Sequence, residues 1–115
     1  MTLEETIIDY LNTNLTGVTA YGEVPTSKPN KFVTIERLGS QTQNKIIQAR
    51  LAVQSWALNS LYDAADLNET VKGILDNIIT LDSIMMCKLD TDYNFTDTEE
   101  KHFRYQAVFL IVYNL

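Results

Sequence analysis

The chain has 115 residues, and its 15 Asp and Glu residues against 9 Lys and Arg residues give a formal net charge of −6. This charge argues against a protein that binds nucleic acid by neutralising phosphates. Hydrophobic residues make up 45% of the chain and charged residues 21%, as in an ordinary globular protein, and the length suits a single domain over residues 1–115.

The N-terminal segment predicts an amphipathic helix. Thr2 and Glu5 fit a capping box, in which each side chain accepts a hydrogen bond from the other residue's backbone N–H. Apolar residues then recur at intervals of three and four over Leu3–Leu15, and Gly17 is well placed to end the helix. The short stretch Val18–Gly22 that follows is expected as an edge strand.

The next part of the chain predicts a β-hairpin. The loop Val24–Lys31 holds both prolines, and Phe32–Leu38 is a strand. Gly39–Asn44 is polar and predicts the turn before a second strand, Ile46–Leu58, which has one apolar face and one mixed face. The apolar face consists of Ile47, Ala49, Leu51, Val53, Ser55 and Ala57, and the mixed face of Ile46, Gln48, Arg50, Ala52, Gln54, Trp56 and Leu58.

A second helix and two more strands complete the chain. Ser60 is the expected N-cap of a helix that ends near Thr80. Ile84–Leu89 predicts a strand, Asp90–Lys101 an acidic loop, and His102–Tyr113 the last strand. This order predicts an α+β fold, with a mostly antiparallel sheet, a long β-hairpin and two helices packed on one face.

The sequence offers no set of residues for catalysis, so the protein is not expected to be an enzyme. Asp90, Asp92 and Asn94 resemble the start of a calcium loop, but Phe95 and Lys101 occupy the positions that need a glycine and a closing glutamate. No metal site and no cofactor are therefore expected.

Cys87 is the only cysteine, and its apolar neighbours predict a buried small hydrophobe. His102 is the only histidine, and solvation at a strand end is favoured over a zinc site. We expect no signal peptide, and the longest apolar run, Ala107–Tyr113, is too short to cross a membrane. These features predict a soluble protein of a reducing compartment.

The length of the second hairpin strand is more than a small core requires. Long arms and edge strands favour pairing with another chain. An exposed sheet face that carries Ile46, Trp56 and Leu58 would be too apolar for a monomer and would mark an interface. These features predict a protein that assembles with other protein chains.

Three ordered stretches carry a family pattern: Val24-Pro25 with Pro29-x-x-Phe32-Val33-x-Ile35 and Gly39; Val53-Gln54-Ser55-Trp56-Ala57 with Ala64-Ala65-x-Leu67-x-x-x-Val71-x-x-x-Leu75; and Asp97 with Phe103-Arg104-Tyr105-Gln106 and an apolar final strand. Together they resemble the tail terminator, or tail completion, proteins of long-tailed bacteriophages and prophages. The similarity runs from about Ile7 to Tyr113.

The resemblance implies a structural virion protein that forms a ring, usually a hexamer, on the head-proximal end of the tail tube. Such a ring ends tube polymerisation and joins the tail to the head connector. The implied partners are other copies of the chain, the tail tube protein and the head-tail connector protein, with no specific nucleic-acid binding and no membrane. The implied location is the virion at the head-tail junction, and the host cytoplasm during assembly. The family has no catalytic residues to carry over, and the matching positions expected to serve packing are Trp56, Ala57, Ala64, Leu67, Arg104 and Tyr105.

The hairpin Arg37–Arg50 is the expected subunit contact, because the core does not explain it. The acidic segment Asp90–Glu100 is second, and in a ring lumen it would let DNA pass without binding it. Two alternatives remain open: a head-completion or connector adaptor protein, and a small binding module with a ligand between helix and sheet. The candidate interface residues are Arg37, Gln41, Gln43, Lys45, Gln48, Arg50 and Trp56.

Overall fold

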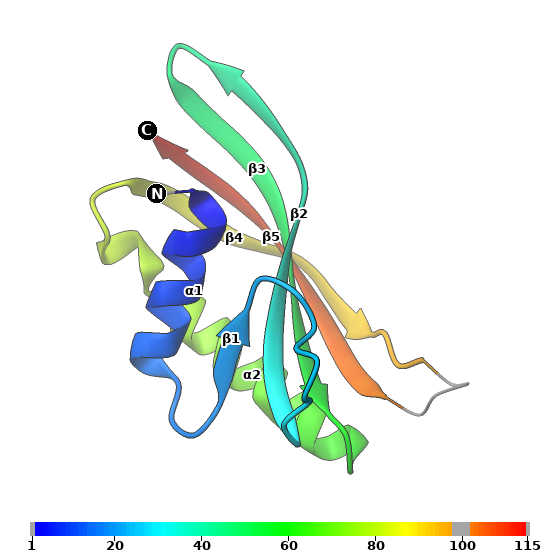
Figure 1. The fold of residues 1–115 in the computed structure, drawn as a ribbon. Coiled ribbons are helices and arrows are strands. Elements are labelled where there is room, and N and C mark those ends of the chain that lie inside the picture. Colours follow the sequence, from blue (N-terminus) through cyan, green and yellow to red (C-terminus); the bar gives the residue numbers. More distant parts are fainter. Residues whose placement is uncertain (1, 98–101, 115) are drawn as a thin grey trace.

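The chain forms one mixed β-sheet with two α-helices packed against one of its faces (Figure 1). The computed structural model describes residues 2–97 and 102–114. The strand order across the sheet is β1-β2-β3-β5-β4, and the predicted fold class is confirmed. The elements are α1 (Leu3–Asn14), β1 (Thr19–Tyr21), β2 (Lys31–Gln43), β3 (Ile46–Ala57), α2 (Leu61–Asp76), the 3₁₀ helix η1 (Ile78–Thr80), β4 (Ile84–Asn94) and β5 (Phe103–Asn114).

The strands pair antiparallel except at one edge. There, β1 runs parallel to β2, with Ala20 opposite Val33. The pairs β2–β3, β3–β5 and β5–β4 are antiparallel. β3 and β5 are therefore the central strands, and every residue of β3 has a partner on both sides.

The predicted N-caps of both helices are confirmed. The backbone N–H of Glu5 donates to the Thr2 hydroxyl over 3.1 Å, and the Glu5 carboxylate accepts from the Thr2 backbone over 3.3 Å. Ser60 caps α2 by accepting from the backbone of Asp63. Among the described residues, neither helix has the length and hydrophobicity that a membrane span requires.

The predicted turn at Gly39–Asn44 was wrong, because residues 39–43 continue β2. The chain reverses at Asn44 and Lys45, whose φ angles are 53° and 67°. A two-residue hairpin turn of type I′ needs positive φ at both central residues, which Asn tolerates and Lys adopts at a cost. The polar residues before this turn form strand all the same, because their backbones pair with β3 up to Gln43 and Ile46.

The apolar face of β3 lies in the main core, as predicted. Its residues are buried from Ile47 to Ala57 at every second position. The helices cover this face through Ile7 and Leu11 of α1 and through Val71 of α2, all with no solvent exposure.

The other face of β3 is solvated only near the hairpin tip. Toward its C-terminal end, a chain of polar side chains crosses β2, β3, β5 and β4. Trp56 Nε1 donates to the Thr34 hydroxyl over 2.9 Å, which donates to Gln54 Oε1 over 2.7 Å. Gln54 Nε2 donates to Gln106 Oε1 over 2.8 Å, and Gln106 donates in turn to the Tyr93 hydroxyl. This polar ladder satisfies the buried amides and explains why the face is neither apolar nor exposed.

Aromatic rings pack against both ends of the ladder, Phe32 on Trp56 and Phe95 on Tyr93. Phe32 stacks on Trp56 with ring centroids 5.3 Å apart and an angle of 11° between the rings. The Arg104 guanidinium lies 4.6 Å from the Trp56 ring centre and 4.4 Å from that of Phe95. A cation between two ring faces stabilises such a cluster electrostatically and shields it from water.

β4 forms the other edge of the sheet and is longer than predicted. Residues 90–94 of the predicted acidic loop belong to this strand. Two β-bulges interrupt its pairing, near Met85 and Asp90, and such bulges disfavour pairing with a further chain.

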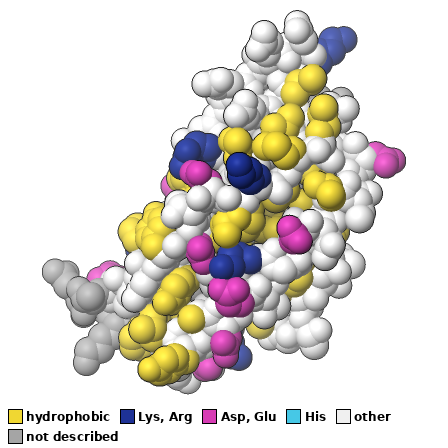
Figure 2. Space-filling model, turned by 180° about the vertical axis from the view of Figure 1, so that it is seen from behind, with side chains coloured by type: hydrophobic (Ala, Val, Ile, Leu, Met, Phe, Trp, Pro, Cys, Tyr) yellow, Lys and Arg dark blue, Asp and Glu magenta, His cyan; other side chains and the backbone are white. Residues whose placement is uncertain are grey.

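Figure 2 shows the molecule from behind, with groups of exposed hydrophobic side chains and basic and acidic side chains between them. The exposed large hydrophobic residues of β4 and the segment just after it are Met85, Leu89, Tyr93 and Phe95.

Candidate subunit interface

The tip of the β2–β3 hairpin, residues 41–46, extends beyond the body of the domain (Figure 1). The molecule measures 44 Å along its long axis and 25 and 24 Å across. The candidate interface residues Gln41, Gln43, Lys45 and Gln48 are all exposed on or beside this tip. Their side chains serve no packing role in the domain core, which leaves them available to a partner.

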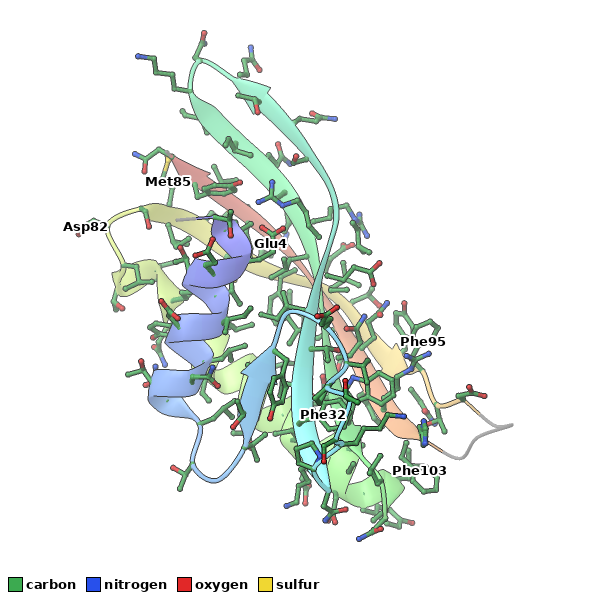
Figure 3. The ribbon with its side chains drawn as sticks, viewed as in Figure 1. Glu4, Phe32, Asp82, Met85, Phe95 and Phe103 are labelled. Atoms are coloured by element: carbon green, nitrogen blue, oxygen red, sulfur yellow. The ribbon has the colours of Figure 1, made fainter. Side chains whose placement is uncertain are left out.

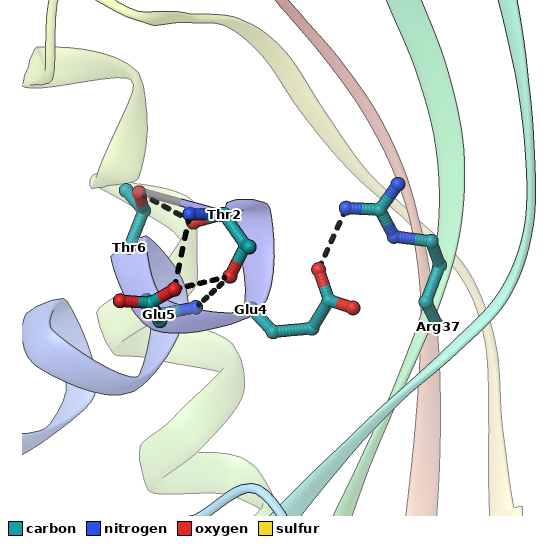
Figure 4. Close-up of polar contacts among 5 residues, drawn as sticks. All are labelled: Thr2, Glu4, Glu5, Thr6 and Arg37. Carbon is teal, nitrogen blue, oxygen red and sulfur yellow. Dashed lines mark hydrogen bonds and ion pairs between the residues drawn. The ribbon is translucent and has the colours of Figure 1, made fainter.

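Arg37 is held inside the domain instead. Its guanidinium lies 2.6 Å from a carboxylate oxygen of Glu4 at the start of α1 (Figure 4) and 6.0 Å from the ring centre of Tyr113. Its side chain is 27% exposed. The contact fastens β2 to the N-terminal turn of α1, where a carboxylate is also favoured by the helix dipole. This in-domain role accounts for Arg37 without a partner chain.

Arg50 lies at the base of the tip and also has a partner in the chain. Its guanidinium is 3.0 Å from Asp90 of β4, and the two side chains are 54% and 48% exposed. A pair this exposed contributes little to stability, at most ~1 kcal/mol. Arg50 therefore remains open to exchange with a carboxylate of another molecule.

Trp56 was expected on an exposed apolar face, and that expectation was wrong. The side chain is 7% exposed, because it is stacked on Phe32 and covered by Arg104. Of its two expected companions, Ile46 is 40% exposed at the tip, and Leu58 is half-buried. The apolar surface of the hairpin is thus confined to Ile46 and to Leu38, which lies exposed at a β-bulge.

A groove that the sequence did not predict runs along α1. It has a volume of about 960 Å³ and lies between α1, the turn after η1 and the end of β5. The turn is fixed by hydrogen bonds from Ile84 N–H to the Leu81 carbonyl and from Asn114 N–H to the Ser83 carbonyl. Figure 3 shows Asp82 on this turn and Glu4 at the neighbouring end of α1. The lining residues are Leu3, Thr6, Asp9, Tyr10, Thr13, Asn14, Leu81, Asp82, Ser83, Ile84, Tyr113 and Asn114.

The groove combines an apolar floor with an acidic rim. Leu3, Ile84 and Tyr113 of the lining are buried, whereas Asp9 and Asp82 are exposed. One sequence feature agrees with the groove without predicting it: Tyr10 lies three residues after Ile7 on the apolar side of α1, where a ring needs a neighbour to pack against. The turn that supplies the opposite wall has no such signal, because the fold alone brings it beside α1.

In the described part of the acidic segment proposed as a second contact, Asp90 and Asp92 are paired within the domain. Asp90 bonds Arg50, and the Asp92 carboxylate accepts hydrogen bonds from Lys72 over 2.8 Å and from Asn68 over 2.9 Å. The bond from Lys72 is the main reason that the pKa of Asp92 lies below its ordinary value. Residues 98–101, which include Glu99 and Glu100, lie outside the described residues.

The described residues hold no cluster of three or more His, Cys, Asp or Glu side chains that could bind a metal ion.

Cys87 is partly buried, and burial, with a smaller effect of Asp76, raises the pKa of its thiol to about 11. Because the thiolate is the reactive form, this cysteine is inert at neutral pH. Trp56 and His102 make an edge-to-face ring contact with centroids 6.3 Å apart.

Comparison with models of known protein families gives no match for this chain, and neither does comparison with curated protein sequences.

Proposed function

We propose that this chain is a structural protein of a long-tailed phage or prophage, which caps the head-proximal end of the tail tube as a ring of identical subunits. In this role it ends tube polymerisation and joins the tail to the head connector. It acts in the virion at the head-tail junction, after assembly in the host cytoplasm, and it carries out no catalysis.

The observation that carries the proposal is the projecting hairpin. β2 and β3 stay paired up to Gln43 and Ile46, and every residue of the tip, 41–46, is exposed beyond the body of the domain. The exposed tip adds little buried surface to its own domain, so its length has no explanation in the stability of a monomer. A contact with another subunit would explain the length of the hairpin. The resemblance of the three sequence stretches to tail terminators, together with the α+β fold, favours a ring on the tail tube as the type of assembly.

The test measures capping of tail tubes in vitro. Purified chain is added to polymerising tail tube protein from a phage or prophage that encodes it, and tube lengths are measured by negative-stain electron microscopy. We expect short tubes with a ring at one end, and further binding of the connector protein to that end. Tubes of unchanged length that carry no ring would contradict the proposal. Binding to the connector but not to the tube would indicate a head-completion or adaptor protein instead.

A shortened hairpin provides the matched variant. Residues 42–47 are replaced by Asn-Gly, which joins the paired residues Gln41 and Gln48 by a type I′ turn and keeps the register of the strands. The variant removes one buried residue, Ile47, but keeps Trp56, the polar ladder and the rest of the core, and circular dichroism verifies that the monomer is folded before assembly is measured. We expect it to lose ring formation and capping together. A shortened variant that still caps tubes would show that the hairpin is not the contact.

A further inference from the structure

We infer that the hairpin tip of one subunit docks in the groove along α1 of the next copy, in a head-to-tail contact. This inference rests on the proposed function, because it takes the assembly of identical copies as its starting point. It names the acceptor surface, which is not the acidic segment that the sequence predicted as a second contact.

Charge complementarity favours this occupant. Lys45 is the only charged residue between Leu38 and Ala49, so the tip is basic although the whole chain has a net charge of −6. Among the described residues that line the groove, Asp9 and Asp82 are acidic and none is basic. An acidic groove repels most of the surface of a second acidic copy, but it attracts this tip.

The apolar parts of the two surfaces also match. Ile46 is 40% exposed next to Lys45, and nothing in its own domain covers it fully. The floor of the groove offers Leu3, Leu81 and Tyr113, together with space that a side chain of this size can enter. Burial of Ile46 would supply the hydrophobic part of the contact, and the Lys45 charge would orient it.

The two surfaces can act at the same time. The lining of the groove shares no residue with the tip, residues 41–46. One subunit can therefore donate its tip to one neighbour and accept the tip of another. Such a heterologous contact generates closed rings or helical filaments, whereas pairing of two β4 edges would give a closed dimer.

The backbone of Lys45 is a separate indication of a role at the tip. Its φ of 67° lies in the left-handed region, which glycine adopts most readily and lysine only at a cost of about 1 kcal/mol. A glycine would suit the turn better, so the lysine stands here against the local backbone preference. Residues that break a local rule are typical of functional positions.

The inference is tested by charge exchange between the two surfaces. The tip variant is Lys45→Glu, and the groove variant is Asp9→Lys with Asp82→Lys; all three positions are exposed, so the monomers should fold. Assembly of each purified chain is measured by sedimentation velocity at high protein and low salt concentration. For each variant alone we expect the dissociation constant to rise by about tenfold or more, because like charges then meet.

Recombination of the variants gives the decisive outcomes. An equimolar mixture of the two should assemble again, since each tip meets a groove of opposite charge, and it should form only rings with an even number of subunits. The chain that carries all three substitutions should assemble alone. Lys88→Glu on the β4 edge is the matched control and should assemble like the unaltered chain.

Three results would overturn the inference: assembly of the single variants at unchanged strength, failure of the mixture to assemble, or loss of assembly in the Lys88→Glu control. An unaltered chain that stays monomeric at every concentration would overturn it as well. None of these results bears on capping of tail tubes, which is measured separately and can succeed through a different contact.

Discussion

The two ends of β3 differ in what surrounds them, although one uninterrupted strand forms both. From Leu51 to Ala57 both faces are buried, one under the helices and the other under the polar ladder and its aromatic cover. From Ile46 to Arg50 only the face toward the helices is covered, and the other is exposed. Backbone pairing is therefore the same along the strand, while side-chain burial changes with position.

This difference separates stability from assembly. Substitutions at the buried end should change the free energy of unfolding of the monomer. Substitutions at the exposed end should leave it nearly unchanged and act on contacts between molecules.

Trp56→Ala should cause the largest loss of stability, ~3–5 kcal/mol in the free energy of unfolding. The substitution removes the stack on Phe32 and the surface on which Arg104 lies. Urea unfolding followed by circular dichroism measures the effect. Gln48→Ala, at the exposed end of the same strand, is the control and should stay within ~0.5 kcal/mol of the unaltered chain. Equal effects of the two substitutions would remove the distinction between the two ends.

Gln54→Leu should cost ~1–3 kcal/mol, because the buried Thr34 O–H loses its acceptor and the buried Oε1 atom of Gln106 loses its donor. The matched control is Gln41→Leu, which places the same change on the solvated tip, where water satisfies the neighbouring groups. Chemical unfolding of both variants measures the difference in their free energies of unfolding. A Gln54→Leu variant as stable as the control would mean that the ladder adds nothing to the buried end.

The sequence predicted the buried face of β3 because its period of two residues is a local signal. Ile47, Leu51 and Val53 alternate with larger or polar residues, and one buried face is sufficient to produce that pattern. The caps at Thr2 and Ser60 were predictable for the same reason, since a cap depends on residues within one helical turn. The fold class followed from the order of these elements.

The burial of Trp56 and the groove along α1 were not predictable, because both depend on segments far apart in the sequence. Trp56 is covered by Phe32 and Arg104, which lie on neighbouring strands. The ladder needs Thr34, Gln54 and Gln106 in one register, and β-bulges in β2 and β4 influence that register at a distance. Polar composition also misled the prediction of the turn, since residues 39–43 form strand through backbone pairing alone.

Asp92→Asn should lower the free energy of unfolding by ~1 kcal/mol at pH 7, because Lys72 loses its partner on β4. The pKa of Asp92 is depressed in the folded chain, mainly by the bond from Lys72, so its stabilisation is complete at neutral pH. That stabilisation is lost as the pH falls below about 4, through the folded pKa. Unfolding curves of the two chains should therefore converge in acid. Asp66→Asn, on the exposed side of α2, is the control and should be as stable as the unaltered chain at pH 7.

Lys45→Gly should have the smallest effect on the monomer and the opposite sign. Glycine adopts the positive φ of this position without strain, and Asn-Gly is the preferred type I′ pair, so we expect a gain of about 0.5–1 kcal/mol in the free energy of unfolding. The same substitution removes the charge of the tip, and assembly measured by sedimentation velocity should become weaker. Lys45→Arg keeps both the charge and the strained turn, and it should retain assembly with no gain in stability. A glycine variant that is more stable and also assembles normally would show that the lysine serves no contact, and the exposed end of β3 would then need another explanation.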